Sequence, residues 1–163
     1  MPRYIGLDPS TKTGYVVLDE DGEIWEAREI EGAGKVDPGR MHDLICQVSR
    51  LIQPGDRVAI EGFGFASQRG FEMGGIGWGI RLNLFARKIG YTEVAPSQLK
   101  KFTGSGGNAG KEAVAVEVYK RWGFQHKSNN VTDAYVLAQI VRAMHEPVKL
   151  IKVQQEIIQK LRG

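Results

Sequence analysis

The chain has 163 residues, of which 42% are apolar and 25% charged, with a formal net charge of +3 and a sequence pI near 9.0. This length and composition are those of one globular domain with a sizeable core. The mildly basic balance suits a nucleic-acid partner without requiring one. The single cysteine excludes a disulfide framework and a cysteine zinc cluster. No apolar run reaches the roughly 20 residues of a membrane span and no signal peptide precedes the first predicted strand, so we expect a cytoplasmic protein without a membrane partner.

The N-terminal third of the chain predicts three short strands in an antiparallel meander. Strand-forming runs at 3–8, 14–19 and 22–30 are separated by a Pro/Ser/Thr/Gly turn and by the turn "DEDG". Apolar residues then recur at three- and four-residue spacing through "MHDLICQVSRLI", which predicts an amphipathic helix ended by "PGD". The nearly continuous apolar run "RVAIEGF" at 57–63 is typical of a buried strand.

The rest of the chain predicts one more strand and several helices. Residues 64–80 are rich in glycine and show no clear periodicity. The predicted segments that follow are a helix at 80–89, a strand at 91–96 ended by Pro96, a short helix at 97–104 capped by Ser97, a loop at 105–110, helices at 111–123 (ended by Gly123) and 131–145, and a final amphipathic helix.

Together these elements predict an α/β fold with a mixed five-stranded sheet. The antiparallel three-strand meander is extended by two further strands, and helices flank the sheet. We expect one domain over residues 1–146 and a C-terminal amphipathic helical tail over 147–163.

Three carboxylates far apart in the sequence each end or begin an apolar element. Asp8 ends the first strand of "YIGLDPSTKTGY", with Gly14 shaping the turn that follows, Glu61 ends "RVAIE", and Asp133 opens the helix "DAYVLAQIV". A carboxylate at the end of a buried strand must find a partner or water, and one on the buried face of a helix requires a compensating cation, for which a metal is one answer. If the three meet at one edge of the sheet, they form a site for Mg²⁺ or Mn²⁺.

Each carboxylate also has an ordinary structural explanation. Asp8 precedes Pro9 and fits an Asx turn, Glu61 fits a salt bridge at the rim of the sheet, and Asp133 lies where the helix dipole favours an acid. The acid and the Thr/Gly turn after the first strand also resemble the phosphate loop of sugar kinases and actin-like ATPases. A metal site is therefore indicated by the three carboxylates together and by no single one of them.

Basic side chains flank two glycine-rich segments near the predicted carboxylate edge. Lys100, Lys101 and Lys111 surround "TGSGGNAG", and Arg69 and Arg81 surround the earlier glycine-rich stretch. Lysine clusters are often solvated surface, but this position favours contact with phosphates.

Aromatic side chains also occur in the earlier glycine-rich stretch. Phe63, Phe65 and Phe71 either stack on or wedge between bases, or form an ordinary hydrophobic anchor. The sequence leaves both interpretations open.

Two amides and a histidine precede Asp133. Asn129 and Asn130 are explained as helix N-caps, or they offer neutral oxygens that bind Mg²⁺ more weakly than carboxylates do. His126 either approaches the carboxylates or belongs to an exposed loop.

Over residues 3–145 the sequence resembles the RuvC-type Holliday junction resolvases, within the retroviral integrase/RNase H superfamily. The resemblance rests on four segments in the same order, "IGLDPSTKTGY", "VAIEGF", "APSQLKKFTGSGGNAGKEAV" and "TDAYVLA". The length and short loops resemble phage- or virus-encoded members. The resemblance implies an RNase H-like nuclease domain, working in the cytoplasm of a bacterium or an infected host cell.

The resemblance implies that Asp8, Glu61 and Asp133 are the metal ligands. One position departs from the family pattern, which has a fourth metal-binding residue, an Asp or sometimes a His, three residues before the final Asp. This chain has Asn130 there, beside Asn129. Either Asn130 completes the metal site through its amide oxygen, as a fourth ligand and catalytic residue, or this chain is a weakened Asp-to-Asn variant.

The resemblance also implies a DNA-binding surface. Lys100 and Lys111 fall at basic positions that contact DNA and help stabilise the reacting phosphate, and Phe63 or Phe65 falls near the aromatic that the family uses at the junction centre. With the neighbouring Lys101 and Arg69, these are the candidate DNA-binding residues.

The implied activity is structure-specific endonucleolytic cleavage of four-way DNA junctions by paired symmetric nicks. Hydrolysis would use two Mg²⁺ or Mn²⁺ ions about 4 Å apart, with Lys111 or Lys100 offsetting charge on the pentavalent phosphate, and no small-molecule cofactor. Cutting two strands symmetrically implies a homodimer, with the 80–89 helix or the C-terminal tail as the candidate interface.

Three alternatives remain at the level of sequence. The first is a nuclease of the same fold that acts on RNA–DNA hybrids or other branched DNA. The second is a fragment of an actin-like ATPase, which needs two such subdomains where this chain has length for one. The third is a branched-DNA binding protein without catalysis, an interpretation that Asn130 favours.

Overall fold

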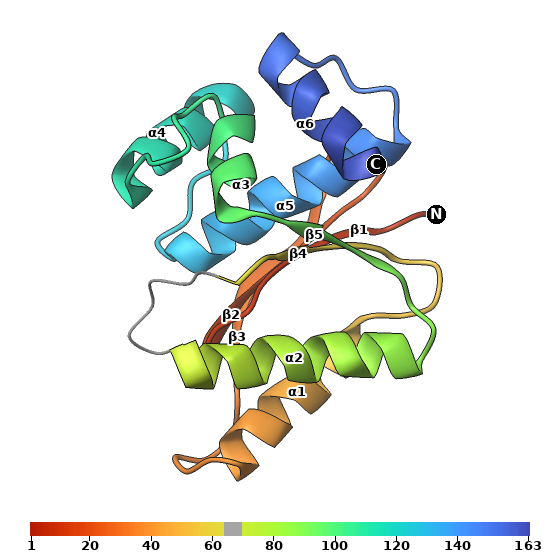
Figure 1. The fold of residues 1–163 in the computed structure, drawn as a ribbon, viewed down its shortest axis with the longest axis vertical. Helices are drawn as coiled ribbons and strands as arrows, with labels where there is room; N and C mark the ends of the chain where they lie inside the picture. Colours follow the sequence, from red (N-terminus) through yellow and green to blue (C-terminus); the bar gives the residue numbers. More distant parts are fainter. Residues whose placement is uncertain (64–69) are drawn as a thin grey trace.

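The computed structural model describes residues 1–63 and 70–163, in which five strands form one mixed sheet (Figure 1). The strand order is β3-β2-β1-β4-β5; β1 pairs antiparallel with β2 and β2 with β3, whereas β4 pairs parallel with β1 and with β5. The strands in chain order are β1 (Tyr4–Asp8), β2 (Lys12–Leu18), β3 (Ile24–Glu31), β4 (Arg57–Glu61) and β5 (Tyr91–Val94). The predicted fold class, a meander extended by two further strands, is confirmed.

Helices cover both faces of this sheet, with α1 and α2 on one side and α3, α4, α5 and α6 on the other (Figure 1). Their bounds are α1 (Gly39–Leu51), α2 (Gly70–Ala86), α3 (Pro96–Phe102), α4 (Lys111–Trp122), α5 (Asn129–His145) and α6 (Lys152–Arg162). Because side chains alternate along a strand, Ile5 and Leu7 of β1 enter the apolar layer under α1 and α2, whereas Tyr4 enters the layer under α5. No helix in the described ranges is both long and apolar enough to cross a membrane.

The helix α5 lies directly on the backbone of β1 and β2. A Cβ atom on Gly6 would lie 1.8 Å from the main-chain oxygen of Ala134, and one on Gly14 would lie 2.0 Å from that of Asn130. Atoms cannot approach so closely, so only glycine allows this contact. Gly14 was expected to shape the turn after Asp8; it lies instead within β2, opposite Asp8, and makes room for the first turn of α5.

The helix α2 begins at Gly70, well before the predicted start near residue 80. Its glycines bring it close to α1: a Cβ atom on Gly79 would lie 2.2 Å from Cδ1 of Ile45. Glycine disfavours an isolated helix, so the sequence pattern hid a helix that forms through this packing.

Two other helix starts also differ from the prediction. The residue before α3 is Ala95, with Pro96 in the first turn, rather than a Ser97 cap. The C-terminal helix α6 begins at Lys152, and its Ile157 and Ile158 are buried in the apolar layer that α3 and α5 share.

Candidate metal centre

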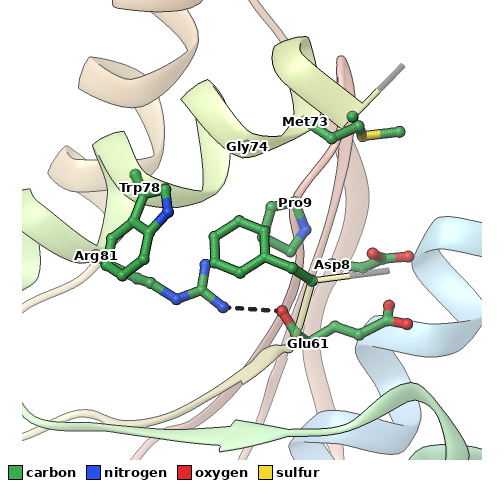
Figure 2. Close-up of a pocket in the computed structure, with 10 residues that line it drawn as sticks. Asp8, Pro9, Glu61, Met73, Gly74, Trp78 and Arg81 are labelled. Atoms are coloured by element: carbon green, nitrogen blue, oxygen red, sulfur yellow. Dashed lines mark hydrogen bonds between the residues drawn. The ribbon is translucent and has the colours of Figure 1, made fainter. Parts of the chain in front are cut away.

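Two of the predicted carboxylates lie at the ends of neighbouring parallel strands. In the pairing of β1 with β4, Leu7 is opposite Ile60, and each is followed by the last residue of its strand, Asp8 and Glu61. Parallel strands bring their carboxyl ends to the same edge of a sheet, so the two side chains emerge together, as Figure 2 shows.

The third carboxylate comes from the first turns of α5. Ser128 caps this helix, its hydroxyl accepting a hydrogen bond from the main-chain nitrogen of Val131 at 3.2 Å. The close contact of α5 with the glycines of β1 and β2 then brings Asp133 to the strand ends. One carboxylate oxygen from each of Asp8, Glu61 and Asp133 lies within 4.8 Å of the others. The structure therefore brings the three predicted residues into one cluster.

Burial raises the pKa of all three carboxyl groups. Asp8 is 9% exposed, and burial, followed by the negative charge of Glu61, holds its pKa well above the usual range. Burial likewise raises the pKa of Glu61. Burial and the charge of Glu61 raise the pKa of Asp133 to about 7. These raised pKa values indicate that the positive charge near the three acids does not fully compensate their negative charge.

A divalent cation fits this arrangement. Mg²⁺ and Mn²⁺ prefer oxygen ligands, and the cluster offers carboxylate oxygens close enough together to share an ion. A bound cation would remove the repulsion among the acids and favour their ionised forms. Asp8, Glu61 and Asp133 are thus the residues able to hold metal at this edge.

Two of the predicted lysines act on the cluster through their charge. Lys100 on α3 and Lys111 at the first position of α4 each lower the pKa of Glu61 and Asp133, opposing the effect of burial. A lysine at a helix N-terminus opposes the helix dipole, and the nearby carboxylates offset this cost. Lys101, on the same helix as Lys100, is exposed to solvent.

Asn130 links α5 to the turn between β1 and β2 and to the first residue of β2. Its amide nitrogen donates hydrogen bonds to Oγ of Ser10 at 3.0 Å and to the main-chain oxygen of Lys12 at 2.8 Å. A carbonyl oxygen only accepts hydrogen bonds, so the nitrogen of this amide must face Lys12. The amide oxygen of Asn130 is the atom left for any ligand.

The other residues before Asp133 have structural positions. Asn129 is the exposed first residue of α5, and the N-cap is Ser128 rather than either asparagine. Nδ1 of His126 accepts a hydrogen bond from the main-chain nitrogen of Ser128 at 3.0 Å, and its ring stacks on that of Phe124 at 6.4 Å. His126 thus supports the start of α5.

An apolar cavity of about 680 Å³ adjoins the carboxylates. Asp8 and Glu61 lie at one side of it, and Phe63, Met73 and Trp78 contribute apolar surface (Figure 2). The rings of Phe63 and Trp78 stack with centroids 5.4 Å apart. Sequence reasoning missed Trp78 because the glycines around it concealed the helix that carries it.

The expectation that Arg81 contacts phosphate is wrong. Arg81 is 3% exposed, and its guanidinium donates hydrogen bonds to the main-chain oxygen of Glu61 and to the carboxylate of Glu93. Phe71 is fully exposed on the first turn of α2 rather than in a flexible loop. The candidate DNA-binding residues Phe65 and Arg69 lie outside the described residues.

The sheet order, the helices on both faces and the acidic residues at the ends of β1 and β4 define an α/β protein with an RNase H-like fold. No model of a known protein family matches the sequence, and no curated protein matches it.

Among solved structures, the chain is similar to RuvC of Thermus thermophilus, with a TM-score of 0.69 and 17% identity over 97% of this chain and 95% of that one. It is also similar to T. thermophilus RuvC in complex with a Holliday junction substrate, with a TM-score of 0.67 and 19% identity over 85% of this chain and 90% of that one. The chain therefore has the RuvC-type resolvase fold that the sequence predicted.

Proposed function

We propose that this protein is a metal-dependent endodeoxyribonuclease that resolves four-way DNA junctions by paired symmetric nicks. The observation that carries the proposal is the cluster of Asp8, Glu61 and Asp133 within 4.8 Å on this fold. The choice of substrate is supported by the similar structure that holds a Holliday junction. Action on such DNA would take place in the cytoplasm of a bacterium or an infected host cell.

Asp8, Glu61 and Asp133 would hold two Mg²⁺ or Mn²⁺ ions. The ions would supply a water activated for attack and stabilisation of the leaving oxygen. Asn130 is proposed as the fourth member of the site, with its nitrogen held by Ser10 and Lys12 and its oxygen available as a neutral ligand. The chain itself contributes a rigid edge on which these groups are fixed before substrate binds.

The basic residues would act on the phosphate. Lys111 and Lys100 are close enough to shift the pKa of Glu61 and Asp133, so they can offset negative charge that develops on a phosphate held at the same edge. Lys101, exposed beside Lys100, would contact the DNA backbone.

The aromatic residues would meet the bases. Phe63 lines the cavity beside the carboxylates, together with Trp78, and a base unstacked at a junction could rest on this surface. Phe65 keeps the DNA-contacting role that the sequence resemblance implies, and Arg69 keeps the phosphate contact that its place beside the glycine-rich stretch favours.

A homodimer with a two-fold axis would place two such centres on two strands. The outer face of α2 is the proposed interface, because it exposes large apolar side chains at helical spacing: Trp78 is 55%, Leu82 62% and Phe85 79% exposed. The alternative interface, the tail, already buries Ile157 and Ile158 against its own chain. We therefore propose residues 1–146 as the nuclease domain and 147–163 as a tail packed on it.

The test is cleavage of a labelled four-way junction, compared with a linear duplex and an RNA–DNA hybrid, with Mg²⁺ or Mn²⁺. We expect paired nicks at symmetric positions in the junction, and their loss in Asp8→Asn and Asp133→Asn. The exposed Glu156 on α6 provides a matched control, because Glu156→Gln removes a carboxylate far from the centre and should leave cleavage unchanged.

Two other outcomes would redirect the proposal. Preferential cutting of the hybrid would identify a nuclease of the same fold with another substrate. Tight junction binding without cleavage by any version would leave a structure-specific DNA-binding protein.

A further inference from the structure

Arg81 is the only buried basic side chain in the part of the chain that the structure describes, with 3% of its surface exposed. It extends from α2 toward the end of β4 and lies beside Glu61 (Figure 2). Burying a guanidinium group is costly unless its donors are paired. The groups that its guanidinium contacts therefore indicate the structural role of Arg81.

The guanidinium donates hydrogen bonds to groups on α2, β4 and β5. Nη2 donates to the main-chain oxygen of Glu61 at 3.1 Å and to Oε1 of Glu93 at 2.6 Å, and Nη1 donates to the main-chain oxygen of Gly77 at 3.0 Å. Glu61 is the last residue of β4, where regular strand pairing stops. Arg81 thus fixes the backbone at the residue whose side chain belongs to the metal centre.

The same guanidinium also holds an aromatic ring. Its Cζ atom lies 4.2 Å from the ring centroid of Phe63, which in turn stacks on Trp78. This packing depends on Gly77, because a Cβ atom there would lie 2.6 Å from Cε1 of Phe63 and 3.0 Å from Nη1 of Arg81. One side chain therefore contacts both the end of β4 and the aromatic surface of the cavity.

A buried ion pair is weak evidence for a gain in stability, although removing one partner alone is costly, and the partner Glu93 is half exposed. The positive charges that lower the pKa of Glu61 are those of Lys100 and Lys111. What Arg81 provides is a fixed geometry.

We propose that Arg81 is a positioning residue for the metal centre: by holding the carbonyl of Glu61 and the ring of Phe63, it makes the metal-ligating end of β4 and the aromatic surface of the cavity one rigid unit. This inference rests on the proposed metal-dependent nuclease. It assigns to the α2 helix a role in aligning the carboxylates with the bound DNA strand.

The test compares Arg81→Met and Arg81→Lys with Arg87→Met. Arg87, the residue that follows α2, is the control, because it also donates to main-chain oxygens, those of Ser49 at 2.6 Å and Ile52 at 2.7 Å, at the end of α2 remote from the carboxylates. Two quantities are measured for each variant: the Mn²⁺ concentration that half-saturates the rise in Tm without DNA, and the Mn²⁺ concentration that half-saturates junction cleavage.

We expect Arg81→Met to raise both half-saturating concentrations by about tenfold, the effect of losing about one net hydrogen bond of positioning energy. Arg81→Lys keeps the charge but cannot serve all three acceptors, so we expect about a threefold rise, which also provides the test if the Met variant does not fold. Arg87→Met should lower Tm and leave both concentrations at the parent values.

Parent values in both Arg81 variants would overturn the inference, and so would an equal change in Arg87→Met. If no version cuts the junction but the Mn²⁺ concentration for thermal stabilisation still rises in Arg81→Met, the inference stands and the proposed substrate fails. If Mn²⁺ does not stabilise the parent at all, both the metal centre and the inference fail.

Discussion

Changing Asn130 to Asp tests what an amide contributes at the start of α5. The change removes the two hydrogen bonds that the amide nitrogen donates to Ser10 and Lys12, and it turns a carboxylate oxygen toward the carbonyl of Lys12. Each lost bond costs about 0.5–1.5 kcal/mol, whereas an acid in the first turn of a helix regains about 0.3–1 kcal/mol from the helix dipole. We expect a net loss of about 1–2 kcal/mol.

For a domain of this length, such a loss corresponds to a fall in Tm of about 2–8 °C. The assay is thermal unfolding followed by circular dichroism in EDTA at pH 7.5. Asn129→Asp is the matched control, since it adds the same charge in the same first turn at an exposed position, without the two hydrogen bonds to lose, and should raise Tm by about 1–4 °C.

Equal melting temperatures for the two Asp variants would refute the structural role of the Asn130 amide. If Asn130→Asp also cut a four-way junction faster than the parent, the position would be that of a metal ligand in which Asp has been replaced. The hydrogen bonds predict the opposite, a variant that is less stable and no more active.

Three further predictions concern the same centre. Gly14→Ala should lower the free energy of unfolding by about 1–3 kcal/mol or more, because the added Cβ meets the backbone of α5. The control Gly90→Ala should cost far less, because nothing lies within 4 Å of a Cβ atom there. Urea unfolding measures both variants, and equal costs would contradict the close contact between β2 and α5. The raised pKa values of the three carboxyl groups mean that the folded state favours their protonated forms, so their contribution to stability is present below about pH 4 and is lost as pH rises toward 7. The Tm in EDTA should therefore fall as the pH rises from 5 to 8, while the increase in Tm caused by Mn²⁺ grows. Asp133→Asn should weaken both trends. An increase in Tm with Mn²⁺ that does not depend on pH would contradict binding of the metal by this cluster. Lys111→Met should slow single-turnover cleavage on the order of 10²-fold at unchanged Tm, and an effect confined to junction affinity would assign Lys111 to binding alone.

The residues that sequence reasoning found at the centre were recognisable because they break an apolar pattern. Asp8, Glu61 and Asp133 each interrupt or open a strongly apolar element, and a charge in such a place requires a partner. The nearly continuous apolar run that includes Glu61 was equally informative, since it could be placed as a buried strand without knowledge of its neighbours.

What the sequence did not show are features that depend on two elements in contact. The glycines of α2 indicate a loop when considered alone, yet Gly79 lies in a helix because Ile45 of α1 occupies the space that a side chain would take. Gly14 likewise had a turn-forming explanation, although it serves the approach of α5.

Arg81 illustrates the same limit for charge. An arginine beside a glycine-rich stretch predicts a phosphate contact, and only the structure reveals that its guanidinium is buried and donates to the main-chain oxygen of Glu61 and to Oε1 of Glu93. Asn130 was identified from its spacing to Asp133, but the acceptors that its nitrogen reaches belong to a connection near the other end of the chain.

The three carboxylates come from elements far apart in the chain, and this determines when their cluster can form during synthesis. The ribosome releases β1 before β4 and β4 before α5, so Asp133 becomes available long after Asp8. Until then the glycine-lined face of β1 and β2 has no helix to cover it. A nascent or truncated chain that lacks α5 consequently cannot assemble the full set of acidic groups, and any cutting activity would arise only once nearly the whole domain has folded.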